Sequence, residues 1–449
     1  MTRPMLFSST RVRKVKSKQK VGLVPTFEGA LKNISRPLIF VPGIMASSLA
    51  IKNADGGDGL DYFWPPLYTF STQEMIEKMY NGLKSPIRVE AQDKVPVQAT
   101  GLFPLAYDYL TSAIESWGYV RNQNFWIFPY DWRQSNDITG KLLADFITNK
   151  IEEGKVNRTD GVDVINHSMG GLVTRAAALQ YRAPIIRTVY IASPHYGSPL
   201  SYFGLHPEIG DDIGFSKFLD LPPIENTLNL SLAMASINNN NINNNDEGFG
   251  KDNNTSETVA LMTTTAGLHP KLKQVFRNFP SMYELLPDFY YLQKRPLLYA
   301  DNTPIYGVDN TYLKNDWKFS EESAVSMTRQ AMKFKKEKLG EKLPGKKEND
   351  LVIYGIEEPT DDTIVYQTRF FISGSGLQPS HVSKHEFSHP YDSGQHGDSW
   401  VPTFSAIGSM SGTSEYPNSK GIPGIHTLLP NYTTTLEHIG NFLLGSRSP

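Results

Sequence analysis

Cysteine is absent from this chain of 449 residues. Without thiols, the protein has no disulfides, no thiolate metal ligands and no thiol nucleophile. Any catalysis must therefore depend on hydroxyl, imidazole and carboxylate groups. The compartment is left open, because exported proteins can also lack cysteine.

An excess of charge of one sign is absent as well. Lysine and arginine total 44 against 46 aspartate and glutamate residues, and the formal net charge is -2. A balanced total gives no electrostatic reason to expect a nucleic-acid partner. We therefore expect none.

Long apolar runs are also missing. No run is long enough to span a bilayer, so no transmembrane helix is expected. Residues 1–30 contain several lysines and arginines, but no apolar stretch of signal-peptide length follows these basic residues. We expect an intracellular protein that is soluble or peripheral to a membrane. The basic arm is either a solvated tail or an electrostatic tether to anionic lipid.

Strand and helix patterns alternate through residues 31–449. A short apolar run that stops at Pro42-Gly43 indicates a buried strand at residues 37–42. Apolar residues on one helical face indicate a helix at 103–117. This alternation predicts an α/β fold, a mostly parallel sheet with helices on both faces. Further strands are predicted at 124–129, 162–166, 188–192, 351–355 and 363–373, and further helices at 137–153, 170–181, 320–339 and 433–444.

The pattern breaks between about residues 200 and 300. Proline, glycine and apolar residues mix irregularly there, and an asparagine-rich tract at 237–245 is expected to be disordered. An insertion just after a central strand is where a mobile lid over an active site would lie. We predict a cap at 200–300, with the asparagines themselves as a loop expansion.

The strongest chemical motif spans residues 162–171. An apolar strand leads into Ser168, small residues follow, and a helix starts at once. This pattern is typical of a nucleophile elbow, a sharp strand-to-helix turn that exposes the serine hydroxyl beside a helix N-terminus. Asn166 stands where the usual Gly-x-Ser-x-Gly pattern has its first glycine. We expect this variation to strain the turn but to be tolerated.

An elbow needs two backbone N–H groups to bind the developing oxyanion. One donor comes from the residue after the serine, and the other from the loop that follows the first long strand. The segment Pro42-Gly43-Ile44-Met45 occupies that loop. We predict that the N–H groups of Ile44 and Met169 form the oxyanion hole.

The acid and the base of this fold follow the serine along the chain. Asp398 lies in a turn, where the acid is expected, although Asp392 is a nearby competitor and both could merely stabilise turns. His426 precedes the last predicted helix, the usual place of the base, whereas His438 falls within that helix. We predict covalent acyl transfer by Ser168, Asp398 and His426, with no cofactor and no metal.

Several motifs together resemble the lecithin:cholesterol acyltransferase family, which includes lysosomal phospholipase and phospholipid:diacylglycerol acyltransferases. The resemblance implies an α/β-hydrolase fold and cleavage of lipid acyl esters, with the acyl group passed to water or to an alcohol such as a sterol or diacylglycerol. It also places His426 on the family's catalytic histidine. The matching motifs are Val41-Pro42-Gly43, Tyr130-Asp131-Trp132-Arg133, residues 166–171, residues 193–199, residues 280–287, the Asp398 turn and residues 436–439.

The chain departs from this family in two respects. It has none of the disulfides of the secreted members, and Asn166 replaces the leading glycine of the elbow. Two other functions stay open beside the lipid acyl hydrolase or acyltransferase. One is an esterase or lipase that uses only water on smaller esters, and the other is a binding protein with an inactive site.

Two side-chain clusters have alternative interpretations. Aromatic residues between Tyr62 and Phe70 resemble in position the family's membrane-binding region, but aromatics of this kind also build protein cores. His381, His385 and His389 have a helical spacing that could suggest a metal site. Pro390 and the residues around it do not favour a helix there, so we predict no metal.

Overall fold

The computed structural model describes most of the chain. The described residues are 19–21, 25, 34–52, 59–64, 72–103, 106–157, 160–205, 274–300, 303–314, 321–360, 362, 364–373, 376–384, 397–409 and 415–445. The asparagine-rich tract and nearly all of the predicted basic arm lie outside them. Within these residues, no helix combines the length and apolarity needed to cross a membrane.

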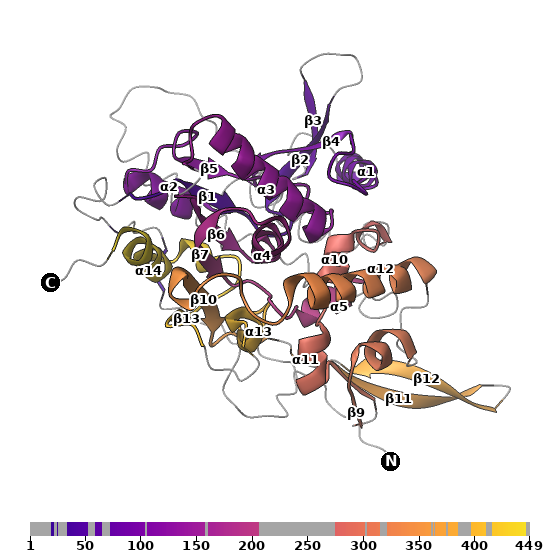
Figure 1. The fold of residues 1–449 in the computed structure, drawn as a ribbon. Coiled ribbons are helices and arrows are strands. Elements are labelled where there is room, and N and C mark those ends of the chain that lie inside the picture. The colour runs from indigo at the N-terminus through magenta and orange to yellow at the C-terminus, as the bar shows by residue number, and fades with distance from the viewer. Residues whose placement is uncertain are drawn as a thin grey trace, which may run out of the picture.

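A parallel sheet of six strands forms the centre of the described chain (Figure 1). Its order is β13-β10-β7-β6-β1-β5, and every neighbouring pair is parallel. The predicted α/β-hydrolase fold is confirmed by this sheet and the helices that cover it. The strands are β1 (Leu38–Val41), β5 (Phe125–Ile127), β6 (Val162–His167), β7 (Ile185–Ile191), β10 (Asp350–Ile356) and β13 (Asn418–Pro423).

Both faces of this sheet are buried under helices. Alternate residues of a strand point to opposite faces, so each strand contributes to two cores. In β1, Leu38 and Phe40 pack in the cluster that contains α2 (Asp108–Ser116) and α14 (Thr433–Leu444). Ile39 and Val41 join the other cluster, with α3 (Asn136–Glu152) and α4 (Gly170–Tyr181). Helices therefore cover the two faces separately.

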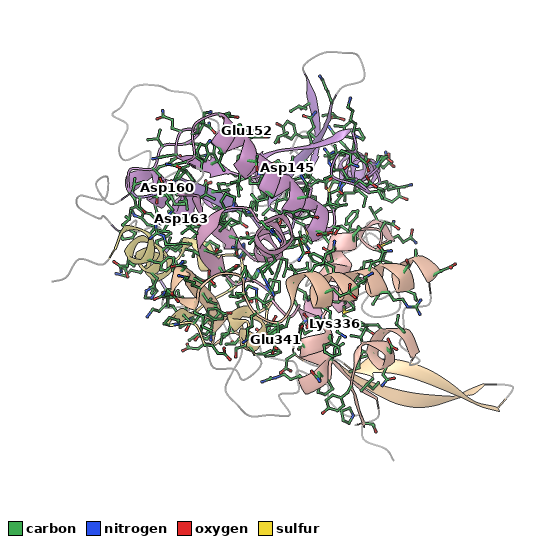
Figure 2. All side chains as sticks on the ribbon, viewed as in Figure 1. Asp145, Glu152, Asp160, Asp163, Lys336 and Glu341 are labelled. Carbon is green, nitrogen blue, oxygen red and sulfur yellow. The ribbon has the colours of Figure 1, made fainter. Side chains whose placement is uncertain are left out.

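Helix α3 shows how sequence selects the buried face. Leu143 and Ile147, four residues apart, are fully buried, and Asp145 and Glu152 are charged side chains on the same helix (Figure 2). The Ser135 side chain caps the helix by accepting a hydrogen bond from the Asp137 N–H. An apolar stripe and a polar cap together hold α3 against the sheet.

The predicted helix at 320–339 consists of two parts. The α-helix α12 (Glu322–Lys333) continues into the π-helical turn η3 (Phe334–Leu339), which ends at Gly340. Gly340 has a φ of 66°, a conformation that favours glycine. Residue Glu321 is the N-cap of α12.

Two smaller sheets flank the main one (Figure 1). Strands β2 (Ser47–Lys52), β3 (Leu60–Trp64) and β4 (Val97–Leu102) form an antiparallel sheet next to α1 (Thr72–Leu83). The predicted strand at 363–373 is β11 (Ile364–Ser373), but it belongs to a separate sheet. That sheet also contains β8 (Leu298–Ala300), β9 (Thr303–Ile305) and β12 (Gly376–Lys384).

Several short helices contribute to the buried core. Leu200 of α5 and Met282 of α10 pack in the same buried cluster as Ile44 and Met169. Residues 206–273, most of the predicted cap, lie outside the described residues, so the cap stays a proposal. The remaining helices are α5 (Pro199–Leu205), α10 (Pro280–Glu284), α11 (Phe289–Lys294), η2 (Asp309–Lys314), η4 (Lys347–Asn349), α13 (Thr403–Ile407) and η5 (Leu429–Asn431).

Candidate active site

The turn at Ser168 has the geometry of a nucleophile elbow. Strand β6 ends at His167, Ser168 has a φ of 53°, and α4 begins at Gly170. A side chain at Gly170 would place its Cβ 2.5 Å from the carbonyl oxygen of Val41, and a Cβ on Gly43 would lie 2.9 Å from the Ser168 Cβ. The two glycines therefore let the loop after β1 pass directly against the elbow.

The strained backbone lies at Ser168 and not at Asn166. A φ of 53° is uncommon for a residue other than glycine, whereas Asn166 keeps strand geometry and pairs with Val41 and Tyr190. The Asn166 side chain is fully buried, and its Oδ1 accepts a hydrogen bond from Ser193 Oγ at 3.0 Å. The strain expected at Asn166 is therefore wrong, because the elbow needs its left-handed residue at the serine.

The side chains of Ser168, His426 and Asp398 form one chain of hydrogen bonds. Ser168 Oγ lies 2.8 Å from His426 Nε2, and His426 Nδ1 lies 2.8 Å from Asp398 Oδ2. The three residues are 5%, 1% and 0% exposed. Because burial excludes water that would compete for these polar atoms, the hydrogen bonds between the three side chains are strengthened.

Asp398 is held by its own turn. Its Oδ1 accepts hydrogen bonds from the Trp400 N–H at 3.1 Å and the Val401 N–H at 2.7 Å, which leaves Oδ2 for the imidazole. Its backbone oxygen accepts the His426 N–H at 2.8 Å. The competing Asp392 lies outside the described residues. This turn therefore fixes the carboxylate and the histidine loop together.

The two histidines near the end of the chain lie in different places. His426 follows β13 in the loop before α14, whereas His438 lies within α14. Partial burial lowers the pKa of His438, and its charged neighbours are Lys420 and Glu437. Only His426 is brought to Ser168.

The two predicted oxyanion donors flank the elbow. Ile44 follows Gly43 in the loop after β1, and Met169 is the N-cap of α4. Both residues are buried, at 8% and 0% exposure. Within the described residues, neither backbone N–H has a hydrogen-bond acceptor. An oxyanion hole requires backbone donors of this kind, so the roles of Ile44 and Met169 stay a prediction.

Sequence analysis missed two rings that enclose His426. The Trp400 ring stacks on its imidazole with centroids 5.0 Å apart and an interplanar angle of 12°. The His167 ring lies 4.8 Å away at 41°. His167 directly precedes Ser168, and Trp400 follows Asp398 by two residues. This proximity in the sequence was the available signal. The imidazole is therefore fixed in plane as well as by hydrogen bonds.

The aromatic cluster between Tyr62 and Phe70 is only partly described. Phe63 and Trp64 of β3 are 2% and 3% exposed, and Trp64 Nε1 donates to the Met45 oxygen at 2.7 Å. For these two residues the membrane-facing interpretation is wrong, because they belong to the core beside the loop after β1. The later members of the cluster, Leu67, Tyr68 and Phe70, lie outside the described residues.

The histidine spacing does not produce a helix. His381 lies in strand β12, so the helical spacing fails at its first member, and His385 and His389 lie outside the described residues. In the described part of the chain, no group of three or more histidine, aspartate or glutamate side chains is arranged to hold a metal.

Comparison with known proteins gives three findings. Residues 94–212 match the family model of lecithin:cholesterol acyltransferase. A stretch of 100 residues is 39% identical to the uncharacterized protein YJR098C of Saccharomyces cerevisiae and covers 21% of this chain, but only 14% of that relative's length. A chain of the Tle4-Tli4 complex superposes with a TM-score of 0.58 over 91% of this chain and 98% of its own, at 14% identity.

These findings agree with the geometry described above. At 14% identity the structural likeness shows the fold alone, and the family match covers the segment that contains the elbow. The chain therefore has an α/β-hydrolase fold, and its residues 94–212 are similar to the lecithin:cholesterol acyltransferase family.

Proposed function

We propose that the protein is a serine-dependent lipid acyl hydrolase or O-acyltransferase that works through an acyl-enzyme. The observation that carries this proposal is the buried chain from Ser168 Oγ through His426 to Asp398, with both hydrogen bonds at 2.8 Å. A nucleophile within reach of a base, and a base oriented by a third group, is the arrangement that activates serine.

Acylation begins with proton transfer from Ser168 Oγ to His426 Nε2. Oγ forms a bond to the ester carbonyl carbon, and the carbonyl electron pair moves onto oxygen. The N–H groups of Ile44 and Met169 stabilise this oxyanion. Loss of one such donor typically removes about 3 kcal/mol of transition-state stabilisation. Asp398 stabilises the imidazolium. The intermediate collapses, the leaving alkoxide takes the proton from His426, and an acyl-Ser168 ester remains.

Deacylation repeats these steps with a second nucleophile. His426 removes a proton from water or from an alcohol, and the oxygen of that molecule attacks the acyl carbon. The bond from this carbon to Ser168 Oγ then breaks, and His426 returns the proton to Oγ. Water gives a fatty acid, and an alcohol such as a sterol or diacylglycerol gives a new ester. No cofactor takes part in these steps. The family match supports a lipid ester as the acyl donor, and peripheral contact with a membrane surface would deliver it.

The experiment has two parts. A fluorophosphonate probe tests the nucleophile, with labelling expected in the wild type and absent in Ser168→Ala of unchanged melting temperature. Mass spectrometry of products from mixed phospholipid and neutral-lipid vesicles, with and without added sterol or diacylglycerol, then separates hydrolysis from acyl transfer.

The outcomes distinguish the alternatives. Folded wild type that fails to react with the probe would identify a binding protein with an inactive site. Turnover of short soluble esters without any release from vesicles would identify a water-only esterase on smaller esters. New acyl esters that appear only with added alcohol would establish the transferase.

A further inference from the structure

His167, the residue before the nucleophile, bridges two loops. Its Nε2 lies 3.1 Å from the backbone oxygen of His426, and its Nδ1 lies 2.8 Å from the Tyr107 hydroxyl. The same hydroxyl accepts the Gly43 N–H at 3.1 Å. One chain of hydrogen bonds therefore runs from the loop after β1 to the loop that carries His426.

The direction of every hydrogen bond in this chain can be assigned. A carbonyl oxygen only accepts, so His167 Nε2 carries a hydrogen and donates it to His426. Burial and the nearby His426 lower the pKa of His167 well below its usual value, so the ring is neutral and Nδ1 is an acceptor. Tyr107 then donates to Nδ1 and accepts from Gly43. With this one tautomer of His167, the Gly43 N–H, the Tyr107 hydroxyl, the imidazole and the His426 carbonyl oxygen all have a hydrogen-bond partner.

The surroundings hold this chain rigidly. Tyr107 is 3% exposed and His167 is 4% exposed. The Tyr107 ring packs edge-on against Phe40 of β1, with centroids 4.7 Å apart. Burial raises the pKa of Tyr107 far above its usual range, so the hydroxyl keeps its hydrogen. The His167 ring packs on the His426 imidazole.

We propose that Tyr107 and His167 are positioning residues that set the oxyanion donor and the base relative to each other. Gly43 directly precedes Ile44, whose N–H is a donor of the proposed oxyanion hole, and His426 is the proposed base. The inference rests on the proposed function, because it assigns these residues to that same site. Small displacements of the reacting groups lower kcat steeply. Binding of the substrate away from the reacting atoms is affected less.

The test uses three variants of the full chain and a matched control. Tyr107→Phe keeps the ring and removes the hydroxyl, and His167→Ala removes both hydrogen bonds of the imidazole. In His167→Gln, the amide nitrogen lies near the position of Nε2 and retains a donor for the His426 oxygen. Tyr109→Phe is the control, since Tyr109 lies on α2 and is only partly buried.

We expect kcat on p-nitrophenyl butyrate to fall about 10-fold to 100-fold in Tyr107→Phe and His167→Ala, with KM changed less than about twofold. His167→Gln is expected to recover part of the loss, and Tyr109→Phe to match the wild type. The double variant Tyr107→Phe, His167→Ala should lose little more than either single variant, because both cut the same chain.

The outcomes separate this inference from the proposed function. A wild type that neither labels with fluorophosphonate nor turns over ester removes the proposed function. An active wild type with kcat unchanged in Tyr107→Phe and His167→Ala, or with losses in KM alone, overturns the positioning role. If the variants do not fold, ¹⁵N-histidine NMR of the wild type decides. The Nε2–H tautomer of His167 supports the chain, and a hydrogen on Nδ1 contradicts it.

Discussion

Strand β6 has a charged group at one end and the candidate nucleophile at the other. At its amino end, Asp163 is fully buried, and both of its oxygens accept hydrogen bonds from the Arg187 guanidinium. At its carboxyl end, Ser168 is held in a left-handed conformation against His426. In open α/β sheets, ligands bind beyond the carboxyl ends of the strands. The amino edge therefore contains a buried ion pair, and the carboxyl edge contains the candidate reactive groups.

The two edges also differ in the partner of a buried carboxylate. Asp163 and Asp398 are both 0% exposed. Asp163 faces Arg187, with Arg36 3.9 Å away, and a guanidinium keeps its charge at every working pH. Asp398 faces the His426 imidazole, whose Nδ1 lies 2.8 Å from Asp398 Oδ2. A permanent counter-ion suits stability, and an imidazole that also contacts Ser168 suits the proposed proton transfer.

Replacing the base should give the largest effect at the carboxyl edge. We expect His426→Ala to lose several orders of magnitude in kcat, because no group then accepts the Ser168 proton. His438→Ala should keep near-normal turnover, since His438 lies within α14 away from the serine. Ester hydrolysis and circular dichroism of both purified variants check the pair. Near-normal turnover by folded His426→Ala would contradict the assignment.

Much of this edge could be predicted from the sequence. The predicted limits of α4 and α14 match the structure residue for residue, and α14 ends before Gly445, a typical stop signal. The structure also brings together Ser168, Asp398 and His426, which follow each other along the chain in the order typical of the fold. Their catalytic roles stay predictions until they are assayed.

The rest depends on contacts between distant segments. His167 bonds to the oxygen of a residue 259 positions further along the chain, which no local pattern reveals. The sheet of β2, β3 and β4 was missed, and the register of both of its strand pairs is irregular. The burial of Phe63 and Trp64 was equally invisible, since core and surface aromatics look alike in a sequence.

Removing the cation at the amino edge should affect stability and not chemistry. Arg187→Met leaves Asp163 buried without its main counter-ion, which typically lowers the free energy of unfolding by about 3–5 kcal/mol. Urea unfolding measures this change. The exposed Arg182→Met is the matched control and should change stability little. We expect kcat of folded Arg187→Met to stay within about twofold of wild type, and a large loss would contradict the division between the two edges.

Glu284 of α10 is a buried carboxyl group whose protonation should affect the free energy of unfolding. Its carboxyl accepts hydrogen bonds from Ser135 Oγ at 2.6 Å and the Asn136 N–H at 2.6 Å, at the start of α3. Burial, only partly offset by these bonds, raises its pKa from 4.5 to about 7. The folded state then holds a proton that the unfolded chain releases. The free energy of unfolding should therefore fall as pH rises from 4.5 to about 7.

The variant Glu284→Gln isolates this contribution. A neutral amide occupies the same space, so the variant should gain stability relative to wild type as pH rises, by about 1–3 kcal/mol at pH above the folded-state pKa. Denaturant unfolding of both proteins at several pH values measures the difference. A stability difference that does not change with pH would show that Glu284 keeps the same charge in both states.

The smallest effect is expected at Asn166, where the elbow lacks its first glycine. Asn166→Gly removes the acceptor of Ser193 Oγ and frees the backbone of the unfolded chain, each at a cost of about 1 kcal/mol or less. Part of this cost is offset, because Asn166 Nδ2 is buried without a hydrogen-bond partner in the described structure. We expect a net loss of about 1 kcal/mol in urea unfolding, with kcat nearly unchanged, since Ser168 keeps the left-handed conformation. Asn166→Ala is the control that removes the hydrogen bond without the glycine entropy. A glycine variant more stable than wild type would show that Asn166 strains the turn after all.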